Sequence, residues 1–328
     1  MSESKSVENT ESKSPMEKIG QNVYQKVKSS GVILPLILLI AALSIISPDF
    51  LTINNFKNIL RQVSVNLIFS VGTAFVILTG GIDVSVGAML AFSAVIMAGL
   101  MPTVGMFPAV LIGLAIGFSL GLFNGLAVAW LKLPAFIVTL AMMLAARAFA
   151  FIYTGGYPVS NIPMSFRFLG SGYIGPFPVP VIISLGVLLI GVLVLKYTTL
   201  GRFIYGIGGN RDAVKLSGVN VIKYEALAYG INGLLAALAG VIMTARLSSA
   251  VPSIAESAPF DAIAAVVIGG VSLSGGKGSL WGVFVGVLIF GVISNGLNLM
   301  SVPSFWQNAV RGIVIFGAIL FDRLRARS

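Results

Sequence analysis

Long apolar blocks follow one another along most of this chain, and they constrain its fold more than any other feature of the sequence. Hydrophobic residues make up 57% of the 328 residues and charged residues only 10%, whereas a soluble domain carries roughly 25% charged residues. The blocks show neither the stripe of an amphipathic surface helix nor the alternation of a membrane β-barrel strand. We therefore expect an all-α polytopic membrane protein.

The number of spans follows from block length, since an α-helix needs about 20 apolar residues to cross a bilayer. Ten blocks approach this length, and eight is the alternative count because several are short or interrupted by glycine. They form a single transmembrane domain over residues 31–322. The predicted spans are 32–48, 63–80, 86–102, 107–130, 135–153, 179–196, 224–246, 258–273, 280–299 and 305–321.

Basic residues predict the orientation of these spans. They gather before the first span, between the sixth and seventh, and after the last, and an even span count places all three clusters on one side. Because cytoplasmic loops carry an excess of Lys and Arg, we expect both termini in the cytoplasm and the segment 154–178 outside. The same bias explains the formal charge of +10 without nucleic-acid binding. Lys57 and Arg61 fall outside in this scheme, against the rule.

The two ends of the chain are polar. Residues 1–30 are a cytoplasmic leader in which Met16, Ile19, Val23 and Val27 share one helical stripe among lysines. This pattern is typical of an interfacial helix on the anionic inner leaflet, and an unstructured leader is the alternative. Residues 323–328 form a basic cytoplasmic tail.

Several kinds of chemistry are excluded by composition. Without cysteine or histidine, the chain has no disulfide, no thiol nucleophile and no imidazole base. The Gly-rich strings 270–279 and 206–211 depart from the P-loop and from GxGxxG, because glycine follows Lys277 and Arg211 takes the place of the last glycine. We therefore predict no enzyme activity, no cofactor and no metal site, and any ATP must be hydrolysed by another subunit.

Glycine recurs every four residues in the fourth span, at Gly113, Gly117, Gly121 and Gly125. Residues spaced by four share one face of a helix. The ridge of small residues predicts close packing against another helix.

Two short strings echo each other. Asn-Gly-Leu at 124–126 is followed by Pro-Ala-Phe at 134–136, and Asn-Gly-Leu at 295–297 by Pro-Ser-Phe at 303–305. The two lie at the ends of spans predicted to run in opposite directions. An inverted repeat produces this arrangement, and chance is the alternative.

The segment 199–218 is the most charged part of the predicted core. Asn210 can cap a short helix that begins at Arg211, and Asp212 then faces the positive end of that helix. Gly218 can end it in the left-handed conformation. The caps predict a rigid helix exposed on the cytoplasmic face, where a soluble subunit could grip it, and an ordinary ordered loop is the alternative.

The string GRFIYGIGGNRDAVKLSGVNV, which begins at Gly201, resembles the cytoplasmic element of the ribose-type permease family of ATP-binding-cassette (ABC) importers. Further matching strings follow the family order over residues 47–321. They are SPDFLTINNFKNILRQVSVN (47–66), LTGGIDVSVGAMLA (78–91), PAFIVTLAMM (134–143), ARLSSAVP (245–252), DAIAAVVIGGVSLSGGKGS (261–279) and NGLNLM (295–300).

The resemblance implies a bacterial inner-membrane permease that carries a monosaccharide. Its implied partners are a cytoplasmic ABC ATPase, a second permease subunit, identical or different, a periplasmic sugar-binding protein and membrane lipid. It also implies that the cytoplasmic loop 197–223 couples to the ATPase, with polar contacts from Arg211 and Lys215 and packing by Leu216. The coupling residues are Gly201, Arg202, Tyr205, Gly208, Asn210, Arg211, Lys215, Leu216, Ser217 and Gly218.

One stretch departs from the family pattern. Glu256-Ser-Ala-Pro259-Phe260 stands where Gly-x-Gly-Tyr-Glu-Leu is usual, so Pro259 replaces a glutamate. This departure can mean a different sugar or a different docking surface, so ribose itself is not carried over.

Polar residues within the apolar blocks are the candidates for a translocation pathway. A neutral polyol needs hydroxyl and amide partners more than charge. Asp83 and Asp261 are expected near an interface, where a charge is tolerated, and Arg147 is expected to be buried with a partner. The alternative is that the charged residues form structural ion pairs and that the asparagines bond to neighbouring helices. The candidate pathway residues are Asn66, Asp83, Asn124, Arg147 and Asn295, with Asn232 as a further amide.

A secondary transporter or channel driven by an ion gradient is the alternative function. Such a protein works alone and usually carries several acids at mid-membrane, whereas this chain has at most two. It also needs no rigid basic helix in the cytoplasm.

Overall fold

The computed structural model describes residues 33–327, so the predicted interfacial helix of the leader lies outside the described residues. The helices are α2 (Ile33–Ile46), α3 (Ile53–Leu78), α4 (Val86–Val104), α5 (Met106–Ala129), α6 (Ala135–Thr154), α7 (Phe168–Ser171), α8 (Val179–Tyr197), α9 (Thr199–Gly209), α10 (Arg211–Leu216), α11 (Val221–Leu247), α12 (Ala258–Ile268), α13 (Leu280–Leu299) and α14 (Ser304–Arg327), with a 3-10 helix at Met164–Arg167. The strands β1 (Tyr173–Ile174) and β2 (Phe177–Pro178) form one short antiparallel hairpin.

The prediction of an all-α polytopic membrane protein is confirmed. A helix lies at each of the ten predicted spans. Within the described residues, seven helices are long and apolar enough to cross a membrane, namely α3, α4, α5, α6, α8, α11 and α13. The apolar helices α2 and α12 are shorter, at 14 and 11 residues.

Several helices differ from their predicted bounds. Helix α3 begins ten residues before its apolar block, where the Thr52 hydroxyl accepts the Asn55 N–H at 3.3 Å, so Lys57 and Arg61 lie on a helix. Helix α12 ends at Ile268 because left-handed glycines begin at Gly270 (φ +85°). The predicted loop 197–223 contains the short helix expected there, α10, and a second helix, α9, and α14 continues through most of the predicted tail.

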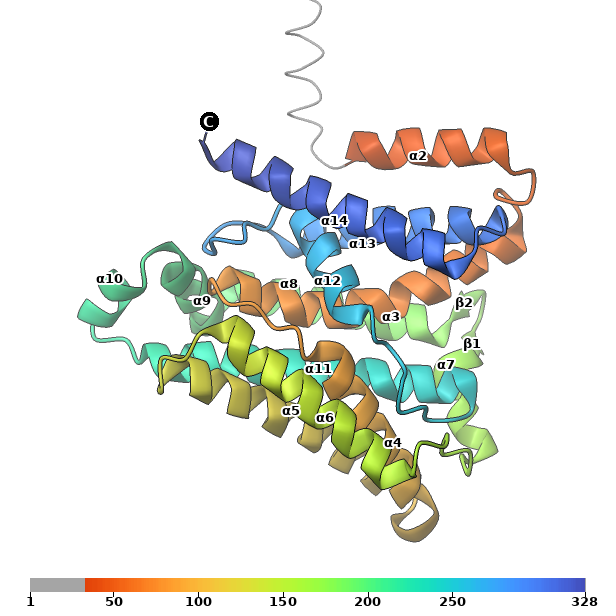
Figure 1. Ribbon diagram of the computed structural model, residues 1–328, viewed down its shortest axis with the longest axis horizontal. Coiled ribbons are helices and arrows are strands. Elements are labelled where there is room, and N and C mark those ends of the chain that lie inside the picture. Colours follow the sequence, from red (N-terminus) through yellow and green to blue (C-terminus); the bar gives the residue numbers. More distant parts are fainter. Residues whose placement is uncertain (1–32, 328) are drawn as a thin grey trace, which may run out of the picture.

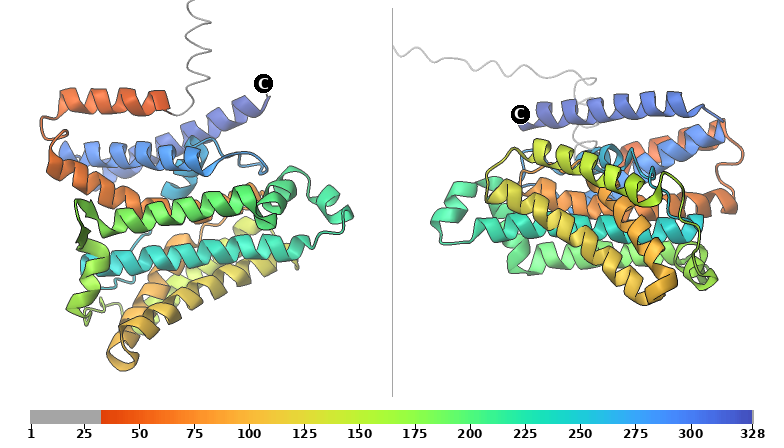
Figure 2. Two further views of the ribbon diagram at one scale, coloured as in Figure 1. Left: turned by 180° about the vertical axis from the view of Figure 1, so that it is seen from behind. Right: turned by 60° about the horizontal axis from the view of Figure 1, so that its bottom comes forward.

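The long helices lie side by side with their axes roughly aligned (Figures 1 and 2). Helices α3 and α11 are at the centre, where most of their side chains are buried. One end of the bundle carries α9 and α10, and we call it the α10 face. The opposite end carries α7, β1 and β2, and we call it the hairpin face (Figure 1).

The predicted glycine ridge is a packing surface. Helix α5 lies against α11, and a Cβ atom added at Gly117 would come within 2.5 Å of the Gly233 carbonyl oxygen. A Cβ at Gly121 would overlap the Tyr229 carbonyl oxygen, and one at Gly125 would lie 2.6 Å from the Ala226 Cα. The backbones of α5 and α11 can approach this closely only because these positions lack side chains.

The two echoing strings end helices at opposite faces, as an inverted repeat requires. Helix α5 ends at the α10 face, where the Ala129 carbonyl oxygen accepts a hydrogen bond from Arg211 of α10. Helix α13 ends at the hairpin face, where Asn295 bonds to Asn55 in the first turn of α3.

Candidate functional site

Helix α10 has the caps predicted for it. The Ala213 N–H donates to the Asn210 side-chain oxygen at 3.0 Å, and Asp212 lies in the first turn. Gly218 adopts φ +80°, which turns the chain away after the last turn. These local bonds fix a helix of six residues that protrudes from the α10 face (Figure 1).

Helix α9 fixes α10 to the membrane domain. The Tyr205 hydroxyl donates to the Gly278 carbonyl oxygen at 2.9 Å. A Cβ at Gly208 would overlap the Leu78 carbonyl oxygen at the end of α3, and one at Gly201 would overlap the backbone of Leu195. Helix α9 therefore packs directly against the end of α3 and the Gly-rich loop that precedes α13.

Arg211 ties α10 to the rest of the protein through a side chain that stays partly exposed. Its guanidinium donates to the Glu225 carboxylate at 2.9 and 3.2 Å and to the Ala129 carbonyl oxygen at 3.3 Å. The hydrogen bond to Glu225 raises the pKa of Arg211. Sequence reasoning treated Arg211 as an exposed contact and missed Glu225. The signal was present, since Glu225 is the one acid inside the apolar block 224–246.

The rest of α10 is open to solvent. None of its residues is buried, and Leu216 is 89% exposed. Lys215, Ser217 and Arg202 of α9 are also exposed. An exposed leucine at the tip of a capped helix, beside basic side chains, is a surface suited to binding another protein.

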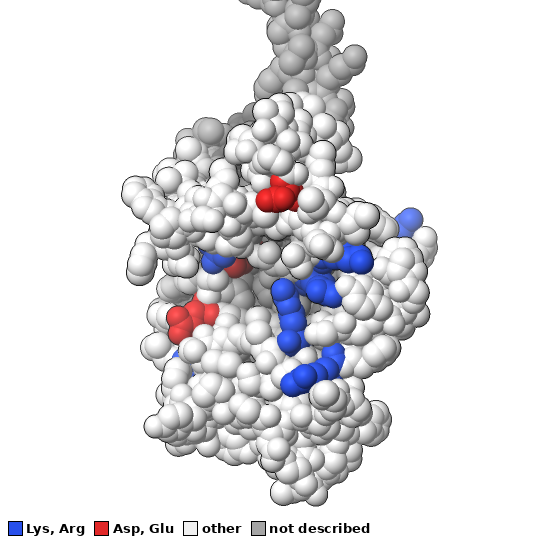
Figure 3. Space-filling model, turned by 90° about the vertical axis from the view of Figure 1, so that its right-hand side faces the viewer, with Lys and Arg blue, Asp and Glu red and all other residues white. Residues whose placement is uncertain are grey.

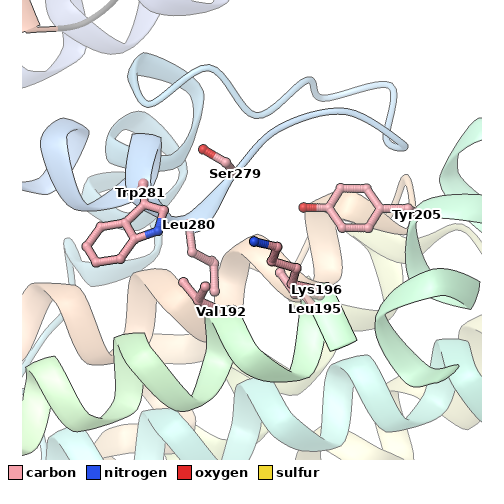
Figure 4. Close-up of a pocket in the computed structure, with 7 residues that line it drawn as sticks. All are labelled: Val192, Leu195, Lys196, Tyr205, Ser279, Leu280 and Trp281. Carbon is pink, nitrogen blue, oxygen red and sulfur yellow. The ribbon is translucent and has the colours of Figure 1, made fainter. Parts of the chain in front are cut away.

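A cavity of about 310 Å³ lies beside α9. Figure 4 shows Lys196 and Tyr205 at one end of it and Trp281 at the other. Helix α9 is thus packed against α3 and the Gly-rich loop but leaves a hollow toward α8 and the start of α13. The cavity is lined by Val192, Leu195, Lys196, Tyr205, Ser279, Leu280 and Trp281.

Asp83 lies in the connection between α3 and α4 and is fully buried within the protein. Its carboxylate accepts the backbone N–H and the hydroxyl of Ser85 at 2.8 and 2.5 Å and the Asn232 amide at 2.9 Å. The Asn124 amide donates to the Ser85 hydroxyl at 3.0 Å. The structure thus brings together three predicted polar residues, Asp83, Asn124 and Asn232, in a network that joins α5 and α11 to the start of α4.

Asn295 and Arg147 also bind other parts of the protein. Asn295 and Asn55 exchange side-chain hydrogen bonds at 2.7 and 3.0 Å. Arg147 is half-buried and donates to the carbonyl oxygens of Pro252 and Ile254 at 2.7 and 2.8 Å, so it holds the connection between α11 and α12. Of Asp83, Asp261 and Arg147, the sequence predicted Arg147 to be the buried one. In the structure Asp83 is fully buried and Arg147 is only half-buried.

Asn66 differs from the other candidates because it lines a cavity. The cavity measures about 180 Å³ and lies between the hairpin-face halves of α3 and α11 and the start of α12. One wall is formed by two residues of the stretch that departs from the family pattern, Ser257 and Ala258, and by the two residues that border it, Ala255 and Asp261. Figure 3 looks onto the hairpin face and shows it hollowed, with most of the basic side chains to the right of the hollow and acidic ones to its left and above it. The cavity is lined by Gln62, Val65, Asn66, Phe69, Met243, Arg246, Ala255, Ser257, Ala258 and Asp261.

Comparison with known proteins places the chain in a family. Residues 55–319 match the family described as "Branched-chain amino acid transport system / permease component". The ribose import permease of Bacillus subtilis is 45% identical over 93% of this chain and 94% of its own length. The chain belongs to the ribose-type permease family. The ribose import permease of Escherichia coli K12 is 46% identical over 88% of this chain and 92% of its own.

Membership in the family confirms the resemblance predicted from the sequence motifs. The D-allose transport system permease of Escherichia coli K12 is also similar, at 40% identity over 90% of this chain and 91% of its own length. No solved structure matches. The chain is therefore a multi-pass transport subunit of an ABC import system and not an enzyme.

Proposed function

We propose that this chain forms the translocation pathway for a monosaccharide in an ABC importer of the bacterial inner membrane. The observation that carries the proposal is the 45% identity to a ribose import permease over nearly the whole of both chains. The family description names amino acids. The relatives reported above, by contrast, are named for ribose and D-allose, and their names favour a sugar as the substrate of this chain.

The α10 face is the docking surface for the ATPase. Capping fixes α10, and Arg211 and Tyr205 fix its base. Leu216 and Lys215 remain free to enter a groove of the partner. A soluble motor can transmit force only through an element that resists bending, and this pair of helices meets that need.

Two helices connect the docking surface to the cavity. The end of α3 touches α9 at Gly208, and the start of α11 holds Arg211 through Glu225. The opposite halves of the same helices line the cavity that contains Asn66. At 1.5 Å per residue, each helix spans about 40 Å. A tilt imposed at the α10 face therefore moves the walls of the cavity.

The remaining partners follow from this arrangement. A periplasmic sugar-binding protein docks on the hairpin face and delivers sugar to the hollow. A second permease subunit, identical or different, completes the pathway. Lipid covers the apolar side chains that α6 and α8 leave exposed. The basic α10 face and both termini lie in the cytoplasm, which agrees with the positive-inside rule.

Reporter fusions test the orientation. Fusions at residues 165, 210 and 325 are expected to report outside, inside and inside, because residue 165 lies just before α7 at the hairpin face and residue 210 caps α10. Alkaline phosphatase and green fluorescent protein, which are active on opposite sides of the membrane, provide paired readouts. An external signal at residue 210 would contradict both the orientation and the docking surface.

Uptake by the reconstituted system tests the function. Proteoliposomes that contain this chain, its ATPase and its binding protein are expected to accumulate D-ribose or D-allose only with ATP. Vesicles that lack the ATPase should accumulate none. ATP-independent uptake that follows a proton or sodium gradient would instead identify a secondary transporter.

A further inference from the structure

We propose that the 180 Å³ cavity between the middle of α3, the hairpin-face end of α11 and the start of α12 is the sugar-selecting site of the pathway. Gln62, Asn66, Arg246 and Asp261 would bind the hydroxyls of one neutral monosaccharide. This inference rests on the proposed function and adds a site and its selectivity to it.

Three of the polar side chains that line the cavity are free to bind a ligand. In the described part of the chain, the side chains of Gln62, Asn66 and Arg246 make no hydrogen bond. Asp261 uses one carboxylate oxygen for the Ser257 hydroxyl at 3.2 Å and the Arg311 guanidinium at 3.9 Å. Its other carboxylate oxygen is buried and has no hydrogen-bond partner. The amides of Gln62 and Asn66 and the guanidinium of Arg246 can therefore bond a ligand without breaking a hydrogen bond within the protein.

The mixture of groups fits a polyol better than an ion. A hydroxyl both donates and accepts, and the cavity offers amides that do both, a guanidinium that donates and a carboxylate that accepts. Since Arg246 and Asp261 line the same cavity, a charged ligand would be repelled by one of them. Phe69 adds an apolar wall for the C–H groups of a sugar ring.

The size of the cavity restricts the ligand further. A cavity of 180 Å³ has room for about six waters at roughly 30 Å³ each. It is smaller than the roughly 300–1,000 Å³ of pockets that hold drug-sized ligands. The volume therefore suits one small ligand such as a single monosaccharide.

Gln62, Asn66 and Phe69 are spaced by four and three residues, so they share one face of α3.

The wall opposite α3 is held in one shape. Arg147 bonds to the carbonyl oxygens of Pro252 and Ile254, and the next residue, Ala255, adopts φ +60°. A left-handed alanine persists only where its surroundings hold it. Arg147 is thus a positioning residue, and the fixed wall lets the cavity discriminate sugars by shape.

The test measures sugar imported per ATP hydrolysed, in proteoliposomes that contain the complete importer. The probe is whichever of D-ribose and D-allose the wild type imports faster. Gln62→Ala and Asn66→Ala are each expected to lower this ratio about tenfold, as the loss of a hydrogen bond of about 1.4 kcal/mol predicts. ATP hydrolysis stimulated by loaded binding protein should stay near the wild-type rate. Gln307→Ala is the matched control, since that amide lies outside the cavity, and its ratio should not change.

The possible results separate the inference from the proposed function. If both cavity variants keep the wild-type ratio, the sugar-selecting site is wrong while the importer stands. If import and ATP hydrolysis fall together in these variants, the two amides are structural and the inference is also wrong. If the wild type imports neither these two sugars nor any other monosaccharide with ATP, the proposed function itself is wrong, and this inference with it.

Discussion

A variant with Lys215→Glu and Leu216→Asp is expected to lose co-purification with its ATPase and to stop importing sugar. Neither side chain is buried, and Leu216 is 89% exposed, so the chain should remain folded and in the membrane. Hot-spot side chains contribute about 2 kcal/mol or more each. Losing two of them weakens docking by about 4 kcal/mol, or roughly a thousandfold. Affinity purification and uptake assays measure the two effects.

Two other variants give this result its meaning. Leu51→Asp is the matched control, since Leu51 is an exposed leucine next to the hairpin-face end of α3, at 71% exposure, and should co-purify normally. Arg211→Gln should weaken docking differently, because it frees Glu225 and loosens α10, and its thermal stability should fall as well. Normal co-purification and import by the double variant would remove the physical support for ATPase docking at α10.

Replacing Gly117 and Gly121 together with Leu is expected to leave little folded protein. At both positions even a Cβ would meet backbone or side-chain atoms of α11 at 2.5 Å or less, and these atoms belong to the buried centre of the bundle. Overpacking costs typically about 1–3 kcal/mol per site, so the pair should lose about 2–6 kcal/mol. Yield after detergent extraction and the melting temperature measure the loss.

Gly186→Leu is the control for this prediction. A Cβ added at Gly186 of α8 meets nothing within 4 Å among the described residues, so the same change of side chain should be tolerated there. Gly121→Ala alone should already destabilise the chain. A double-leucine protein with wild-type yield and melting temperature would mean that this face of α5 meets lipid.

The sequence alone determined the fold class and the places of the helices. Crossing a bilayer requires a long apolar helix whatever its neighbours are, so hydropathy over a local window located a helix at all ten predicted spans. The caps of α10 were predictable for the same reason, since Asn210 and Gly218 act on backbone atoms within three or four residues of themselves. The glycine ridge also followed from spacing along one helix.

Only the tertiary structure decided what each polar residue does. A carboxylate or guanidinium takes the partner that helix packing brings to it, and hydropathy along the chain does not contain that information. Asp83 therefore proved to be buried beside Ser85 and Asn232, while Arg211 forms a salt bridge with Glu225 of α11. Asn66 looked like Asn124 and Asn295 in sequence. It alone faces the cavity, because α11 and α12 do not close over that face of α3.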